Sequence, residues 1–219
     1  MTTFHHHTQL PNPGSTLAPY RRLLVTLLLM AGLTGPAHAD NPGPLAQVRT
    51  TVDAILAILR APDPSSTSKR GKITQLIAER FDFDLMAQQT LATNWRHATT
   101  EERKRFVELF TRLLQATYLG RIEAYTNEKV EYRGEKIRHN QAMVKTVIID
   151  GNTEIPVNYK LREQKEDGAW RVYDVVIEKV SLIATYRSDY RAIVNKDGIT
   201  GLLAQIKEKI HSLEKDKTT

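Results

Sequence analysis

The sequence contains no cysteine, which excludes disulfide bonds, cysteine-ligated metal sites and thiol catalysis. It also contains no glycine-rich loop of the kind that binds phosphate groups, and no Gly-x-Ser-x-Gly motif of a serine hydrolase. The stability of the protein must therefore come from an apolar core. The common sequence motifs of nucleotide binding and serine hydrolysis are missing.

Histidine is scarce in the part of the chain that we expect to fold. Beyond residue 39 only His97, His139 and His211 remain, and they fall in a predicted loop, a predicted turn and the C-terminal tail. None of them has a second ligand at the spacing of a metal site. We expect surface histidines, no bound metal and no cofactor.

The most apolar stretch of the chain is too short to cross a membrane. It is Leu23–Leu33, eleven residues, whereas a spanning helix needs about twenty. Arg21 and Arg22 precede it and Ala37-His38-Ala39 follows it, which is the order of a secretory signal peptide. We therefore expect a signal peptide over 1–39, read by the general secretion pathway, and an exported protein.

The remaining 180 residues suffice for one domain. We place a single folded domain at 40–211 and a polar tail at 212–219. The whole chain has 31 Lys and Arg against 25 Asp and Glu, and the two signs are interspersed without long runs. This pattern, together with export, disfavours nucleic-acid binding.

The spacing of apolar residues predicts several amphipathic helices. A first helix follows Pro44, a second covers about 68–80, and a short third helix begins after Asp82 as its N-cap. Thr99 and Glu102 form a capping box, which predicts the start of the longest helix. Two further helices are predicted at the C-terminal end: 182–194 and 199–210.

Between these helices the pattern changes to that of strands. Four are predicted, joined by turns that contain Gly or Asn and therefore favour an antiparallel meander: 130–133, 142–149, 154–162 and 169–178. Helices and an antiparallel sheet in one chain indicate an α+β fold. The spacing of the apolar residues does not show whether they fill an ordinary core or line an internal cavity, and both interpretations stay open.

The last predicted strand contains an ionisable residue in an apolar run. Asp174 lies between Val172 and Ile177, and a buried carboxylate needs a partner or a raised pKa. A general base in an exported enzyme with a cone-shaped pocket is one interpretation. A structural ion pair between Asp174 and Arg187 is the interpretation that we favour.

Three blocks of residues resemble the MlaC or toluene-tolerance auxiliary family. They are Phe81–Met86 with Trp95 downstream, Ile155–Leu161, and Trp170–Glu178 continuing to Tyr186-Arg187-Ser188. The resemblance implies an α+β fold in which a curved four-stranded antiparallel sheet, wrapped by amphipathic helices, encloses an apolar pocket. Lys179 stands where the family commonly has glycine, which puts the turn after the strand in doubt.

The resemblance also implies a function without catalysis. It implies a periplasmic carrier that shuttles phospholipid between an outer-membrane lipoprotein complex and an inner-membrane ABC transporter complex, and we expect a monomer. One branch is associated with hopanoids, so the ligand could be hopanoid or another lipid. An exported enzyme that uses Asp174, and an adaptor that only contacts the transporter, are the alternatives.

The resemblance and the apolar pattern together give a set of candidate lipid-binding residues. Each of them could equally belong to an ordinary core, because the sequence does not show which face of the sheet meets the ligand. The candidates are Leu113, Leu114, Tyr118, Tyr125, Val147, Ile149, Val157, Tyr159, Tyr173, Val175, Ile177, Leu182 and Tyr186.

Overall fold

The computed structural model describes residues 41–62, 66–125 and 128–215, and the predicted signal peptide lies outside them. The helices that precede the sheet are α2 (Pro44–Arg60), α3 (Ser66–Arg80), α4 (Phe83–Leu91), α5 (Asn94–His97) and α6 (Thr100–Glu123). Among the described residues, no helix is both long and apolar enough to cross a membrane.

Local signals in the sequence fix two of these helix starts. Asp82 caps α4, where its side chain accepts a hydrogen bond from the amide of Leu85 at 2.9 Å. The capping box of Thr99 and Glu102 begins α6, with the Glu102 amide donating to Thr99 Oγ1 at 3.2 Å. Both predicted caps are confirmed.

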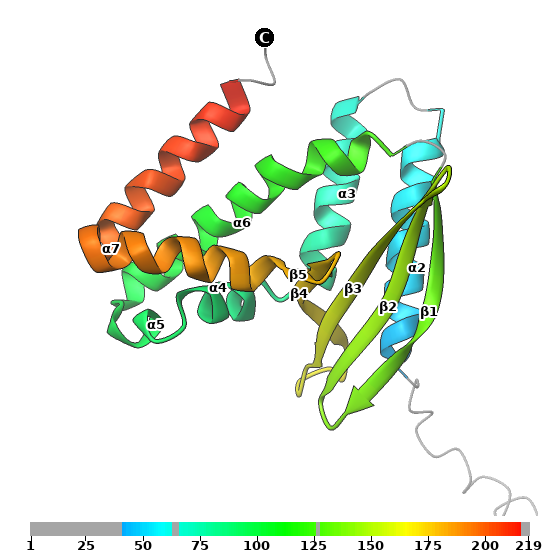
Figure 1. The fold of residues 1–219 in the computed structure, drawn as a ribbon, viewed down its shortest axis with the longest axis horizontal. Coiled ribbons are helices and arrows are strands. Elements are labelled where there is room, and N and C mark those ends of the chain that lie inside the picture. Colours follow the sequence, from blue (N-terminus) through cyan, green and yellow to red (C-terminus); the bar gives the residue numbers. More distant parts are fainter. Residues whose placement is uncertain (1–40, 63–65, 126–127, 216–219) are drawn as a thin grey trace, which may run out of the picture. The chain divides into compact units, whose positions relative to one another are not determined.

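The sheet is an antiparallel meander in the order β1-β2-β3-β4-β5 (Figure 1). Its strands are β1 (Lys129–Arg138), β2 (Gln141–Asp150), β3 (Thr153–Glu163), β4 (Trp170–Ile177) and β5 (Val180–Ser181). The predicted count of four strands is wrong, because the chain turns back at Glu178 and Lys179 and adds β5. Both residues have positive φ, 48° and 73°, a conformation that usually calls for Asn or Gly.

The C-terminal helix α7 (Leu182–Lys215) is bent at Gly198, whose φ of 69° and ψ of −177° interrupt the helical backbone (Figure 1). The two predicted helices of this region are thus the two arms of α7. The second arm continues to Lys215, so the tail that we placed at 212–219 is helical over its described part.

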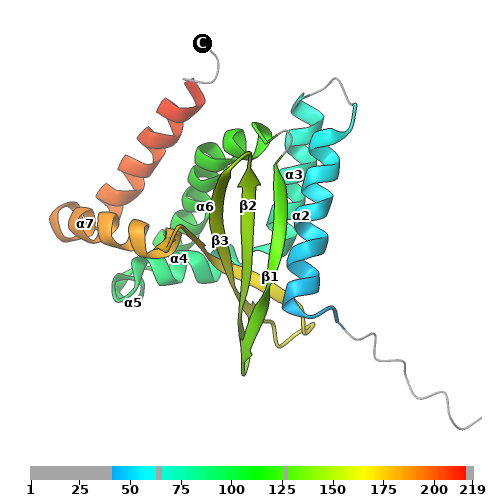
Figure 2. The ribbon, with the colours of Figure 1, turned by 45° about the vertical axis from the view of Figure 1, so that its right-hand side comes forward.

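Two hydrophobic cores hold the described residues together. One lies among α4, α6 and α7 and includes Phe106, Phe110 and Tyr190. The other lies between α2 and the sheet and includes Val48 and Leu161. Phe81 packs against both cores. Figure 2 shows α2 and α3 side by side, with α2 along β1 and β2.

The strand register assigns each sheet residue to one of two faces. The inner face, toward α2, carries Val144, Thr146, Val157, Tyr159 and Val172, and the opposite face carries Met143, Lys145, Val147, Lys160 and Asp174. The register shifts between Lys160 and Leu161, which makes Tyr173 the extra residue of a bulge. Because of this bulge, Val172 and Val175 both reach the inner face.

Candidate functional site

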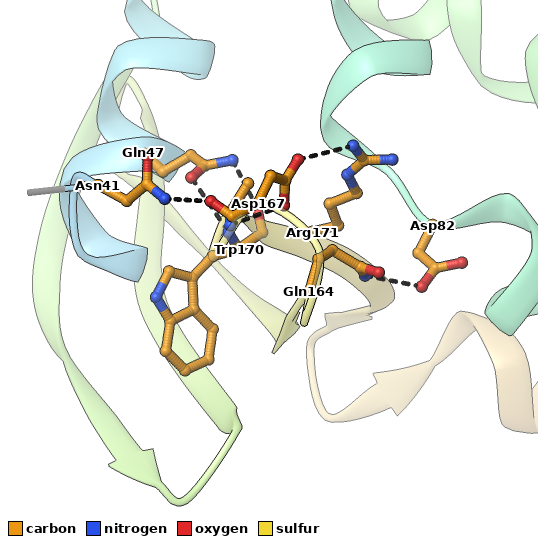
Figure 3. A network of polar contacts seen from close by, with 8 residues as sticks. Asn41, Gln47, Asp82, Gln164, Asp167, Trp170 and Arg171 are labelled. Carbon is orange, nitrogen blue, oxygen red and sulfur yellow. Dashed lines mark hydrogen bonds and ion pairs between the residues drawn. The ribbon is translucent and has the colours of Figure 1, made fainter. Parts of the chain in front are cut away.

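The end of the sheet where β3 leads into β4 is fastened to the helices by polar contacts (Figure 3). Gln47 of α2 donates from Nε2 to the Trp170 carbonyl and accepts at Oε1 from the Trp170 amide at 3.3 Å. Gln164 donates from Nε2 to Asp82 Oδ2 at 3.0 Å. We call this the closed end, because buried hydrogen bonds of Gln47 hold α2 against the sheet there and a partly buried one of Asp82 holds the start of α4.

A small cavity lies beside the closed end, between α2 and the inner face. Its volume is about 20 Å³, and its lining includes Val48, Arg80, Phe81 and Trp170. A hole of this size holds about one water molecule, whereas ligand pockets measure roughly 300–1,000 Å³. The predicted apolar pocket is therefore not open at this end in the part of the chain that the structure describes.

Away from the closed end, apolar side chains are half-buried and belong to neither core. They come from the second half of α2, from α3, from the end of α6 and from β1 to β3. We call these residues the apolar seam: Ile55, Leu56, Ile58, Leu59, Leu76, Ile77, Ile122, Tyr125, Val130, Ile148 and Ile155. Such incompletely covered apolar area is what a nonpolar ligand can cover.

The ends of α2, α3 and α6 are tied together by surface contacts. Arg70 at the start of α3 donates from Nε to Glu123 Oε1 at 2.8 Å, joining α3 to the end of α6. Lys69 Nζ donates to the carbonyls of Leu59 at 3.0 Å and Ala61 at 2.7 Å, at the end of α2. The pair is bidentate, because Arg70 Nη2 also donates to Glu123 Oε2 at 2.5 Å, and the two side chains are 44% and 24% exposed. The contacts at this end are thus partly exposed to solvent, whereas those between Gln47 and Trp170 at the closed end are buried.

Two tyrosines lie near each other at the seam, Tyr125 after α6 and Tyr159 on the inner face. Burial raises the pKa of Tyr159 to about 12, and the nearby Tyr125 adds to the rise. Burial also raises the pKa of Tyr125, followed by the charges of Glu128 and Asp150. Both hydroxyls therefore stay protonated at neutral pH, and they add no charge to the seam.

The comparisons with known proteins agree on one family. The family model described as MlaC protein matches residues 49–208, which is most of the chain. The chain belongs to the MlaC family. The intermembrane phospholipid transport system binding protein MlaC of Haemophilus influenzae is 25% identical over 193 residues, covering 84% of this chain and 90% of that protein.

A solved structure of similar fold is the phospholipid-binding protein from Ralstonia solanacearum, determined in complex with a phospholipid. It shares 26% sequence identity with this chain at a TM-score of 0.69, over 78% of this chain and 98% of that one. Phospholipid binding and lipid transport are thus the functions found among relatives of this MlaC-family chain.

The structure separates the predicted lipid-binding residues into three groups. Tyr125, Val157, Tyr159, Val175 and Ile177 lie at the seam or on the inner face beside it. Another group belongs to the helical core or packs against it: Leu113, Leu114, Tyr118, Tyr173, Leu182 and Tyr186. Within this second group Tyr186 packs edge-on against Phe110, with ring centroids 5.2 Å apart.

The third group is Val147 and Ile149, which lie on the other face of the sheet. Thr146 pairs with Val157 across β2 and β3, so Val147 points to the opposite face, and so does Ile149 two residues later. Neither residue can line the same site as Val157. The strand pattern alone could not show this, because β2 is apolar on both faces over Val147–Ile149.

The predicted ion pair between Asp174 and Arg187 is also wrong. Asp174 is 2% exposed, and its Oδ2 accepts from Lys160 Nζ at 2.9 Å and from Ser181 Oγ at 2.7 Å. Its Oδ1 accepts from the Ile183 amide at 3.2 Å. Arg187 instead donates from Nε to the Gln89 carbonyl at 2.8 Å. Asp174 thus ties β3, β4 and the start of α7 together, on the face away from Val157.

The seam residues of α2 and α3 were missed as candidates. Their signal in the sequence is the length of the apolar stripe of α2, which continues through Ile55 and Leu59 although the sheet core uses only its first half. The sequence shows the stripe but not the element that it faces. In this MlaC-family chain α2 lies along β1 and β2, and α3 packs against α2 and contacts β4.

Proposed function

We propose that this protein is a non-enzymatic carrier that binds the acyl chains of a phospholipid against the apolar seam. The observation that carries the proposal is the seam itself, which combines half-buried apolar side chains from α2, α3, α6 and the sheet. Membership of the MlaC family and the phospholipid bound by the Ralstonia relative support the choice of ligand.

Binding requires the seam to open, because the cavity beside the closed end has a volume of only about 20 Å³. The contacts of Arg70 and Lys69, where α2, α3 and α6 end, are partly exposed to solvent. In the proposed carrier the α2–α3 pair moves away from the sheet at that end, while Gln47 and Asp82 hold the closed end. Acyl chains then occupy the space between the inner face and the two helices.

The energetics of lipid transfer suit such a carrier. Burying one methylene is worth about 0.8 kcal/mol, so two acyl chains with roughly thirty methylenes represent on the order of 20 kcal/mol. Free lipid therefore hardly ever crosses water. A nonpolar protein interior removes this barrier without holding the lipid irreversibly, since membrane and protein are similar environments for the chains.

We place this transfer in the periplasm, after export by the predicted signal peptide over 1–39. In this proposal the carrier moves phospholipid between an outer-membrane lipoprotein complex and an inner-membrane ABC transporter complex and docks with each only transiently. The name of the Haemophilus influenzae relative, an intermembrane phospholipid transport system binding protein, supports this assignment.

Organic extraction of the purified protein, followed by lipid mass spectrometry, tests the proposal. We expect co-purifying diacyl phospholipid at a stoichiometry near one lipid per chain. Bound hopanoid would keep the carrier but change its ligand. A folded protein that carries no lipid, and that takes up none from phospholipid vesicles, would rule the carrier out.

A further inference from the structure

The apolar inner face becomes progressively uncovered toward β5. One cross-strand row contains Thr146, Val157, Ile177 and Val180, which pair successively from β2 to β5 and point to the same side. Their exposed fractions are 1%, 6%, 39% and 60%. The row thus runs without interruption from the buried sheet to solvent.

The row at the closed end, two rows away on the same face, is covered on β2, β3 and β4. Ala142, Leu161 and Val172 pair across these strands and are 5%, 0% and 5% exposed, whereas Ile137, which pairs with Ala142 from the edge strand β1, is 49% exposed. Along β4 the cover over the inner face is therefore complete at Val172 and ends toward Ile177. The uncovered part of this face continues from there into β5.

Several hydrogen bonds hold the β4–β5 hairpin in place, so the exposure of its apolar residues Ile177 and Val180 is a stable property of the fold. Asp174 fastens its base from the opposite face through Ser181, and the Glu178 amide donates to the Pro156 carbonyl at 2.9 Å. The turn keeps positive φ at Glu178 and Lys179, which costs roughly 1–2 kcal/mol per non-glycine residue. The fold thus holds Ile177 and Val180 at the surface despite local strain.

We propose that Ile177 and Val180 form the portal through which acyl chains pass between solvent or membrane and the inner face. The inference rests on the proposed function and adds the route of the ligand. An apolar row that continues the buried face lets a chain slide along nonpolar contacts instead of crossing water. The portal takes the hydrocarbon part of a diacyl lipid, with the headgroup beside the charged turn of Glu178 and Lys179.

The absence of cysteine allows a direct test with single labels. Val180→Cys carries an environment-sensitive nitrobenzoxadiazole dye. Ile137→Cys is the matched control, because Ile137 is also an exposed apolar residue of the inner face, at 49% exposure, but lies on β1 at the closed end. Each labelled protein is loaded with a phosphatidylcholine that carries a doxyl spin label near the glycerol end of one acyl chain, and bound spin is counted by electron paramagnetic resonance.

We expect the loaded lipid to quench most of the fluorescence at position 180 and little at position 137. Equal quenching at both positions, or none at 180 in protein with counted lipid, would overturn the portal and leave the carrier standing. Failure of any spin-labelled lipid to bind would overturn the carrier, and the portal with it.

A second measurement separates lipid passage from docking of a partner protein. Transfer of fluorescent phospholipid to vesicles of phosphatidylethanolamine and phosphatidylglycerol is followed with no other protein present. We expect Val180→Asp to slow transfer about tenfold, since a charge on the route raises the barrier, while Ile137→Asp transfers at the normal rate. Unchanged transfer by Val180→Asp would refute the portal, because a docking role alone needs a partner.

Discussion

Ser181 donates a hydrogen bond from Oγ to Asp174 Oδ2 at 2.7 Å, and the same Oγ accepts from the Ala184 amide at 3.1 Å. One hydroxyl therefore links the buried carboxylate of β4 to the first turn of α7, where Ser181 is the capping residue. The β4–β5 hairpin and the helical core are joined through this contact.

Removing the carboxylate should destabilise the fold more than removing its cation. Asp174→Ala leaves Ser181 and the Ile183 amide without their acceptor, and we expect it to lower the free energy of unfolding by about 2–3 kcal/mol. Lys160→Met should cost less, because Asp174 keeps its other donors. Urea unfolding measures both variants, and equal losses would contradict the role of Asp174 as a tie to α7.

Replacing the strained turn should stabilise the protein. The double change Glu178→Asn with Lys179→Gly introduces the two residues preferred in a hairpin turn with positive φ at both positions. We expect the free energy of unfolding, measured with urea, to rise by about 1–2 kcal/mol. Lys207→Gly, on the exposed side of α7, is the control and should lose about 1 kcal/mol. A loss in the turn variant would mean that the side chains of Glu178 and Lys179 make stabilising contacts.

Charge on the inner face should expel the ligand. Val175→Glu places a carboxylate beside the seam, and we expect the purified variant to contain no phospholipid by mass spectrometry, because burial of an unpaired charge is costly. Val147→Glu makes the same change on the opposite face and should retain lipid. Full lipid occupancy in folded Val175→Glu would show that the chains lie elsewhere.

Weakening the far end of the helices should speed lipid exchange. Arg70→Met removes the pair with Glu123, and we expect faster transfer to vesicles with a change of less than about 1 kcal/mol in stability. Gln47→Leu, at the closed end, should instead lower stability by about 1–3 kcal/mol, because the Trp170 backbone loses its partner. If Gln47→Leu speeds lipid transfer and Arg70→Met does not, the site opens at the end beside Gln47 and Trp170 instead.

Stability should fall at alkaline pH because of buried tyrosines. Burial raises the pKa of Tyr159 and of Tyr186 to about 12, above the ordinary value near 10 of the unfolded chain. The unfolded state therefore loses these protons first, and stability present below pH 10 is lost between about pH 10 and 12. Tyr159→Phe should flatten this decline in urea unfolding, and an unchanged slope would contradict the assignment.

The sequence allowed the elements to be predicted where the signal is local. The capping box at Thr99, the cap at Asp82 and the alternation along β3 all depend on neighbouring residues, and the structure confirms them. The β4–β5 turn escaped prediction because neither Glu178 nor Lys179 is a usual turn residue.

The site was harder to predict, because its composition depends on contacts between distant parts of the chain. Lys160 reaches Asp174 only through the register of β3 and β4 with its bulge at Tyr173. Val147 and Val157 have similar side chains, and only the position of α2 decides which of them faces the seam. The alternation of residues along a strand shows which side chains share a face, but it does not show which face the helices cover.

The short length of β5 also bears on how an apolar protein avoids aggregation. A carrier with uncovered nonpolar area is at risk of pairing with other copies through an open sheet edge. Here one edge strand has only two residues, Val180–Ser181, and the other, β1, has an irregular register between Tyr132 and Gly134. The short β5 and the irregular register of β1 both limit the regular row of free amides and carbonyls that a second copy could pair with.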